Sequence, residues 1–457
     1  MEVTNSSLPR SMRFARSGVN AVEADCTLRR WDSVNGSDNF TPSGANEIRI
    51  KISAGNSFLN GEKHYLYFKV TGATNAFFID GHAGSFFDRV TIESNGQLLE
   101  RLDRYALYSN LRKFYNGGEL RDINNLNVSA GGGGLVIDVP NGGLTNNSTP
   151  AVTQSSLGQK TLAGQSRICC IELESGLFKN HHEKAIPMGS SELDLVLRLK
   201  QNNGAIVAPV ADAPTWTISQ PRFYAPCYQI LNGDVLSAYR EMMSQQGILI
   251  GGDTAKTYIN SISNGASDGQ SVQINDRSLS CKALVSILRS GTADSTKEIY
   301  SNTGFQLGDG TGAVTRYEYK INGESYPRGG IDVTLATNGQ DVGRAYNEAI
   351  KALSKHGESV SHCSVDLAQF AGSATNTYTA TAQGATSVTK GIMAVDLKKF
   401  DDDQLRMVGM NTAQNSSPNV LEITKTAFAA GDKEVTTFSI VEAFWSVSPT
   451  GTWSVAV

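Results

Sequence analysis

The chain has 457 residues, 40% of them apolar, and a formal net charge of −4 at neutral pH. This length exceeds what one hydrophobic core usually organises, so we expect two domains. A nearly neutral chain lacks the basic excess of a dedicated nucleic-acid-binding protein. No apolar run is long enough to span a bilayer, and the first residues show no signal-peptide pattern.

The composition favours an all-β fold, because glycine, serine, threonine and asparagine are abundant and the apolar runs are short. The six cysteines are scattered and match neither a disulfide framework nor a zinc-binding spacing. We therefore expect a reducing compartment and no cofactor.

Residues 1–45 are polar and irregular, and we interpret them as an N-terminal arm outside the core. Arg10, Arg13 and Arg16 lie three residues apart within it. A solvated terminus is the simplest interpretation of such a segment.

After the arm, alternation of apolar and polar residues predicts strands. In the first half these strands cover residues 48–52, 65–70, 167–173 and 193–199. The sharpest local pattern is Asn95-Gly96 between two apolar runs, because both residue types accept the positive φ of a type I′ hairpin turn. Helical spacing follows over residues 103–114. The long stretch 120–166 contains four consecutive glycines and predicts a functional or mobile loop.

Residues 216–243 lie between two halves of similar length. Their first part, 216–224, predicts a strand, and Pro221 suits a sheet edge or a strand end. We expect Pro226 to stop this strand and residues 232–234 to cap a helix. We therefore interpret residues 226–252 as a hinge with a linking helix.

The second half repeats the order of the first. Strands are predicted over residues 278–288, 315–321, 391–397, 421–426 and 435–445. Asn322-Gly323 turns the chain as Asn95-Gly96 does, and a helix is predicted over 341–353. The shared order indicates a duplicated β unit.

Four segments were considered as sites of chemistry, and each is better explained as structure. His181-His182-Glu183 has no third metal ligand at a fitting spacing. Adjacent residues such as His362-Cys363 rarely form a catalytic dyad. Residues 401–403 lack the glycine and distal glutamate of a calcium loop, and residues 308–312 lack the strand–helix frame of a phosphate-binding loop. We predict no catalytic, cofactor-binding or metal-binding residue, and thus no enzyme.

Four stretches, taken in order, carry a resemblance. They are residues 87–105 with the Asn95-Gly96 turn, the link at 216–243, Asn322-Gly323 followed by Tyr326-Pro327, and the closing turn and strand at 409–426. Together they resemble the double jelly-roll major capsid proteins of small eukaryotic double-stranded DNA viruses, such as polinton-like viruses, virophages and adintoviruses. The chain departs from that pattern at Asn322, where a valine is usual, and it is shorter than many relatives.

The resemblance implies an all-β chain of two consecutive eight-stranded jelly-roll sandwiches, residues 46–225 and 253–457, with short helices in loops. It implies a homotrimeric, pseudo-hexagonal capsomer that tiles an icosahedral shell beside penton and minor capsid proteins. The chain would be made inside the host cell and would reside in the virion. Its arm would face inward, clamping a neighbouring trimer or touching the genome or an inner membrane. Structural turn and assembly roles would fall to Asn95, Gly96, Asn322, Gly323, Tyr326 and Pro327.

The alternative is an intracellular β-sandwich protein that binds or cleaves glycans. A glycan-cleaving enzyme would cluster acidic residues at the interface between the barrels, and a lectin would carry aromatic residues on loop tips. Trp216, Trp445 and Trp453 lie in or near predicted strands, which indicates core positions. The absence of a recognisable site favours the structural role over the fold analogy with enzymes.

Overall fold

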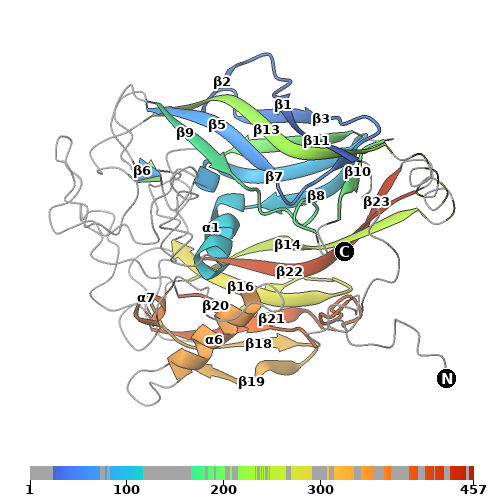
Figure 1. Ribbon diagram of the computed structural model, residues 1–457. Helices are drawn as coiled ribbons and strands as arrows, with labels where there is room; N and C mark the ends of the chain where they lie inside the picture. The colour runs from blue at the N-terminus through green and yellow to red at the C-terminus, as the bar shows by residue number, and fades with distance from the viewer. Residues whose placement is uncertain are drawn as a thin grey trace, which may run out of the picture.

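The structure is a computed structural model in which two β-sandwiches stack on one another (Figure 1). It describes residues 24–72, 78–79, 83–116, 166–180, 184–189, 192–200, 206–207, 215–231, 247–263, 269–290, 306–307, 313–333, 341–353, 365, 367–371, 391–399, 407–415, 417–426, 433–448 and 452–457, with five single positions between 232 and 246. In this part of the chain no helix is long and apolar enough to cross a membrane.

The first sandwich has the connectivity of a jelly roll. Its long strands are β1 (Ala24–Asp32), β3 (Glu47–Ile52), β5 (Tyr65–Gly72), β7 (Phe87–Ser94), β8 (Gln97–Asp103), β9 (Ser166–Ile171), β11 (Leu193–Leu199) and β13 (Trp216–Ile230). They form one sheet in the order β1-β13-β5-β9 and a second in the order β3-β11-β7-β8. Short strands at the margins are β2 (Asn39–Phe40), β4 (Phe58–Leu59), β6 (Phe78–Ile79), β10 (Ile186–Pro187) and β12 (Ile206–Val207).

The second sandwich repeats this order strand for strand. Its long strands are β14 (Ile248–Ile262), β15 (Gly269–Ile274), β16 (Cys281–Ser290), β18 (Ala313–Ile321), β19 (Glu324–Asp332), β20 (Met393–Asp396), β21 (Asn419–Lys425) and β22 (Lys433–Val447). Their sheets run β14-β22-β16-β20 and β15-β21-β18-β19. β17 (Gln306–Leu307) and β23 (Trp453–Ala456) are added at the edges. The predicted duplication is confirmed, and we call the two sandwiches the first and second roll.

The two main helices are equivalent in chain order, because each follows the strand that completes an Asn-Gly hairpin. They are α1 (Tyr105–Asn116) after β8 and α6 (Asp341–Leu353) after β19. A one-turn helix η3 (Ala83–Phe86) and the short helix α7 (Leu367–Ala371) are also present. Helix α1 begins two residues later than predicted, because Arg104 has a positive φ of 53° and its carbonyl accepts the first helical hydrogen bonds.

Alternation of side chains builds each core, as in β3, where Ile48, Ile50 and Ile52 are buried between exposed Glu47, Arg49 and Lys51. This is the pattern of a strand with one face on the core and one on solvent.

The prediction of an irregular arm up to residue 45 is wrong from Ala24 onward. Strand β1 pairs with β13, and its Trp31 ring lies 5.9 Å from the ring of Phe223. The Trp31 indole donates to the carbonyl of Ser53 over 2.9 Å, and Phe40 of β2 is fully buried. Residues 1–23, with Arg10, Arg13 and Arg16, lie outside the described residues.

The predicted ends of the hinge are also wrong, because β13 continues through both prolines to Ile230. Pro221 sits in a bulge rather than at an edge or end: the register with β5 shifts between Ser219 and Arg222, and Gln220 has a φ of 52°. The last β13 residue paired with β5 is Tyr224, so the missing N–H of Pro226 removes no bond to β5.

Strand β14 begins at Ile248, so the glycines at 251 and 252 lie inside a strand and do not end the link. The link between the rolls is therefore shorter than predicted. Its described positions, which are Gly233, Ser237, Tyr239, Glu241 and Gln245, are helical, as expected for a linking helix.

Candidate functional site at the seam between the rolls

The two rolls are joined by an extensive buried contact, which we call the seam. From the first roll it involves β8, α1 and the loop 174–177, and from the second roll β14 and β22. In Figure 1, α1 lies between the sheets of the two rolls. The Trp445 indole of β22 donates to the carbonyl of Leu99 on β8 over 2.9 Å, and Trp445 is fully buried.

Glu100 is the polar centre of the seam. It is buried, and it accepts hydrogen bonds from the backbone N–H of Gly176 over 2.8 Å and from the hydroxyl of Thr254, on the second roll, over 2.8 Å. The Ser175 hydroxyl and the Leu177 N–H also donate to it. Burial raises the pKa of Glu100, and these hydrogen bonds oppose the rise. A buried acid thus ties one strand and one loop of the first roll to the second roll.

The backbones of the two rolls approach closely at two glycines. A Cβ atom placed on Gly176 would lie 2.3 Å from the carbonyl oxygen of Asp253, and one on Gly252 would lie 2.3 Å from the carbonyl oxygen of Gly176. The Trp445 ring lies 3.0 Å from both hypothetical atoms. Only glycine fits here, because any side chain would separate the rolls.

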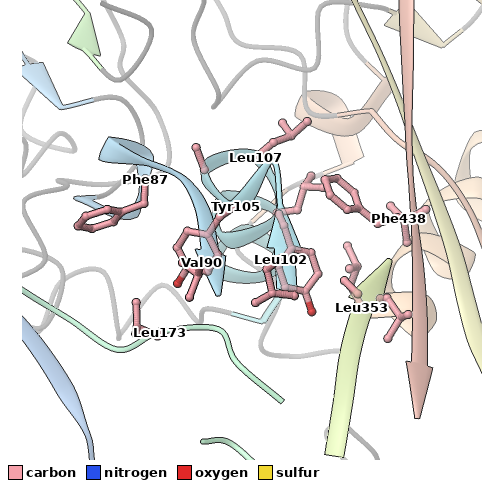
Figure 2. Packing of buried hydrophobic residues seen from close by; sticks show 14 of the residues in the cluster. Phe87, Val90, Leu102, Tyr105, Leu107, Leu173, Leu353 and Phe438 are labelled. Atoms are coloured by element: carbon pink, nitrogen blue, oxygen red, sulfur yellow. The ribbon is translucent and has the colours of Figure 1, made fainter. Parts of the chain in front are cut away.

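Apolar and charged contacts extend the seam along α1. The Tyr108 and Phe438 rings lie 5.5 Å apart, and Figure 2 shows Phe438 and Leu353 of the second roll near α1. Arg104 pairs with Glu434 over 3.2 Å, with both side chains mostly buried. The Arg112 guanidinium donates to the carbonyl of Leu353, the last residue of α6, over 2.6 Å. The two helices are therefore connected across the seam.

The loop that carries Gly176 is held by its own ion cluster. Glu174 lies 3.0 Å from the Lys179 ammonium and 3.3 Å from that of Lys113, and its N–H donates to the Tyr105 hydroxyl over 2.9 Å. Burial disfavours the charged form of Glu174, but Lys179, Lys113 and Arg112 outweigh it and hold its pKa well below the usual range.

The predicted turn residues form two-residue hairpins. The φ angles are 50° at Asn95 and 80° at Gly96, and 52° at Asn322 and 85° at Gly323. Ser94 pairs with Gln97 and Ile321 with Glu324, so both turns match type I′, the type predicted for Asn95-Gly96.

Tyr326 and Pro327 lie on β19 and are joined by a cis peptide bond. Tyr326 is half-buried against the core. The assembly role of Tyr326 and Pro327 remains a prediction.

The segments considered for chemistry, which are residues 181–183, 308–312, 362–363 and 401–403, lie outside the described residues. Among the residues that are described, no group of three His, Cys, Asp or Glu side chains could hold a metal ion.

Sequence reasoning missed the seam residues Glu100, Gly176 and Thr254. It placed Trp445 in a core, which its burial confirms, but not at the contact between the rolls. One local pattern could have indicated Glu100, because it interrupts the apolar run of Leu98, Leu99 and Leu102. No local pattern marks Thr254 as its partner, since the two residues are 154 positions apart.

No protein-family model matches the chain, and no curated protein matches it. Solved structures do match over nearly the whole length. The capsid of the virus PBCV-1 aligns at a TM-score of 0.59 and 12% identity, covering 97% of this chain and 99% of that one. The Sputnik virophage structure aligns at 0.57 and 12%, covering 100% and 93%, and the mavirus major capsid protein at 0.54 and 12%, covering 100% and 95%. The chain therefore has an all-β double jelly-roll fold.

Proposed function

We propose that this chain is the major capsid protein of an icosahedral double-stranded DNA virus. The observation that carries the proposal is the whole-length match to a viral capsid chain, which includes both rolls and the link between them. A shell protein acts by burying surface between copies and needs no catalytic residue. The three matched structures come from viruses, and none of them is a glycan-binding or glycan-cleaving protein.

We further propose that three copies associate into one capsomer. The rolls have the same strand order and are fixed to each other by the seam, so three chains would present six similar sandwiches. Six sandwiches in a ring form a nearly hexagonal block, and such blocks tile a flat facet. Partners would then be neighbouring trimers, penton proteins and minor capsid proteins, and the location would be the virion.

Residues 1–23 are proposed to act in assembly on the inner side of the shell. The favoured role is a clamp on a neighbouring trimer, since Arg10, Arg13 and Arg16 are too few to neutralise much DNA. Contact with the genome or an inner membrane is the alternative, and added salt would weaken it.

The test is the shape and mass of the purified chain. We expect light scattering to give the mass of three chains and negative-stain microscopy to show pseudo-hexagonal particles or shells. A folded monomer that persists at micromolar concentration would overturn the proposal. A glycan-array screen run on the same sample covers the alternative, and a specific glycan ligand bound by a monomer would favour it.

A further inference from the structure

Three charged side chains meet on neighbouring strands of the second roll. Strands β14, β22 and β16 lie side by side in one sheet (Figure 1), and they carry Asp253, Glu442 and Lys282. The Lys282 ammonium lies 2.9 Å and 3.0 Å from the two carboxylate oxygens of Asp253, and 3.7 Å from Oε1 of Glu442. We call these three residues the Lys–Asp–Glu triad.

The backbone of the sheet brings the triad together. Asp253 and Glu442 are cross-strand partners, so their side chains lie on the same side of the sheet. The register of β16 with β22 shifts between Cys281 and Ala283, which makes Lys282 the extra residue of a bulge. A bulge redirects a side chain, and here Lys282 reaches across β22 to Asp253 on β14.

The triad is largely removed from water. The side chains of Lys282 and Glu442 are 4% and 6% exposed, and that of Asp253 is 33% exposed. The other oxygen of Glu442, Oε2, accepts hydrogen bonds from the Val408 N–H over 2.9 Å and from the Ser280 hydroxyl, so Oε1 is the oxygen near the lysine. Desolvation of a buried ammonium and carboxylate offsets much of their attraction. An amide in place of the ion pair would remove both buried charges.

We propose that Lys282 and Asp253 condense to an intramolecular isopeptide bond, with Glu442 as the acid–base residue that moves the proton. The inference goes beyond the proposed function and does not depend on it. Because Nζ lies within 3.0 Å of both Asp253 oxygens, the carbon between them is at about the 3–3.5 Å separation of reacting atoms. Three paired strands hold the two groups there, and such fixed proximity replaces chemical activation of the acid by a high effective concentration.

The reaction balances within the chain. One proton passes from the Lys282 ammonium to the Asp253 carboxylate, and the freed electron pair of Nζ attacks Cγ to form the C–N bond. Oε1 of Glu442 takes a second proton from the nitrogen and delivers it to the Asp253 hydroxyl. The C–O bond then breaks, one water leaves through the partly exposed side of Asp253, and the amide remains. Nothing is oxidised or reduced, and Glu442 returns to its initial state.

Other lysine–carboxylate pairs of the described structure lack this combination of burial and contact. Lys200 is as buried as Lys282, but its ammonium lies 3.7 Å from Asp88, beyond hydrogen-bond distance. Lys320 lies 2.6 Å from Glu422, but both side chains are 39% exposed, so water hydrates and screens the two charges. The Lys320–Glu422 pair therefore serves as a matched control for the triad.

The bond would fasten the strand that opens the second roll. It would join β14 to β16 across β22, closing the segment 253–282 into a covalent loop that persists in the unfolded chain. Asp253 also borders the seam, since its carbonyl oxygen would lie 2.3 Å from a Cβ on Gly176. The cross-link would thus hold the part of the second roll on which the first roll rests.

The test is the mass of the denatured full-length chain, compared with the mass calculated from its sequence. We expect the unmodified chain to lack the mass of one water, and proteolytic digestion to release a branched peptide that joins Asp253 to Lys282. Lys282→Arg keeps the positive charge but stays protonated and cannot form the amide, so it should have its full sequence mass. Glu442→Gln should also have its full mass, although Lys282 and Asp253 are both present.

Glu422→Gln is the control, and it should keep the deficit of one water. Circular dichroism reports whether each variant is folded, and we expect Lys282→Arg to fold but to melt at a lower temperature than the unmodified chain. A deficit retained in Glu442→Gln would overturn the role assigned to Glu442.

Two results would overturn the bond itself. One is an unmodified chain that has its full sequence mass after purification and after prolonged incubation. The other is a deficit that persists in Lys282→Arg, since the water would then have been lost elsewhere in the chain. The branched peptide of the unmodified chain decides the question even if a variant fails to fold. Neither result bears on the capsid proposal, whose test is the mass and shape of the assembly.

Discussion

The indole N–H of Trp445 donates to the carbonyl of Leu99, 346 residues earlier in the chain, over 2.9 Å. This bond joins the last long strand of the second roll to a hairpin strand of the first. Both groups are buried, so neither can exchange its partner for water. Loss of the indole donor should therefore lower the free energy of unfolding by more than the loss of an exposed hydrogen bond would.

The first prediction follows from that bond. Trp445→Phe should lower the free energy of unfolding by about 1–3 kcal/mol more than Trp216→Phe, because it leaves a buried carbonyl unsatisfied. Trp216 is the matched control: it is equally buried, but its indole nitrogen has no hydrogen-bond partner in the described structure. Chemical denaturation of both variants measures the difference. If both variants lost the same free energy of unfolding, the smaller ring volume, and not the missing hydrogen bond, would determine the loss.

The second prediction concerns the close approach of the backbones. Gly176→Ala should destabilise the protein by about 1–3 kcal/mol or more, since its Cβ would lie 2.3 Å from a backbone oxygen of the other roll. Gly343→Ala, on α6, has open space around the new Cβ and should stabilise by about 1 kcal/mol through helix propensity. Thermal melts of the two variants should move in opposite directions. A shift of the same sign in both would contradict the seam geometry.

Particular elements show what the sequence could predict. Strand β3 and the Asn95-Gly96 turn were predictable, because alternation and turn chemistry act within a few residues. Strand β1 was not, since it lies on an exposed edge and its residues 24–29 are all exposed or half-exposed, leaving no alternation to detect. Strand β22 extends two residues beyond its predicted span at each end.

Strand β13 shows a second limit. A proline is compatible with a strand where its missing N–H opposes no partner, and this depends on where the neighbouring strand ends. The seam was unpredictable for a similar reason: Glu100 and Thr254 form their hydrogen bond only when the two rolls are stacked, so the local sequence of neither residue indicates it.

The third prediction tests the type I′ turn. Gly96→Val should destabilise by about 1–2 kcal/mol or more, because φ at Gly96 is 80° and a β-branched residue is strained there. Gly36→Val is the control: Gly36 is exposed, has open space at the Cβ position and shows no positive φ. Melting temperatures compare the two. An unchanged melting temperature for the Gly96 variant would show that the turn does not require glycine at this position.

The fourth prediction is a pH dependence caused by His64. This histidine is buried, its Nε2 accepts from the N–H of Leu173 over 2.8 Å, and its Nδ1 lies against the carbonyl of Gly61. Burial lowers the pKa of His64 to about 4, aided by the charge of Lys179. The depressed pKa means that its stabilising contribution is complete above the ordinary pKa near 6.5 and is lost as pH falls toward 4, by at most about 3 kcal/mol.

The measurement for His64 is the difference between two stability curves. His64→Gln cannot titrate, so its free energy of unfolding should fall less steeply than that of the unmodified chain between pH 6.5 and 4. The ionisable residues near His64, Glu172, Glu174 and Lys179, are present in both chains and cancel in the difference. Parallel curves would show that His64 does not titrate in this range.

The last prediction treats Glu100 as the connection between the rolls. Glu100→Ala removes the acceptor for Gly176 N–H and the Thr254 hydroxyl, so we expect the free energy of unfolding to fall by about 1–3 kcal/mol or more. Glu422→Ala is the control, because Glu422 pairs with Lys320 at the surface, and it should cost less than about 1 kcal/mol. Since burial raises the pKa of Glu100, its contribution to stability falls as pH rises through that raised pKa. Glu100→Gln should therefore keep an acceptor at the seam and flatten this dependence.

Calorimetry tests whether Glu100 couples the two rolls. If it does, the rolls should melt separately in Glu100→Ala, whereas Glu100→Gln and Glu422→Ala should each show a single transition. A single transition in Glu100→Ala would show that Trp445 and the apolar contacts of α1 suffice.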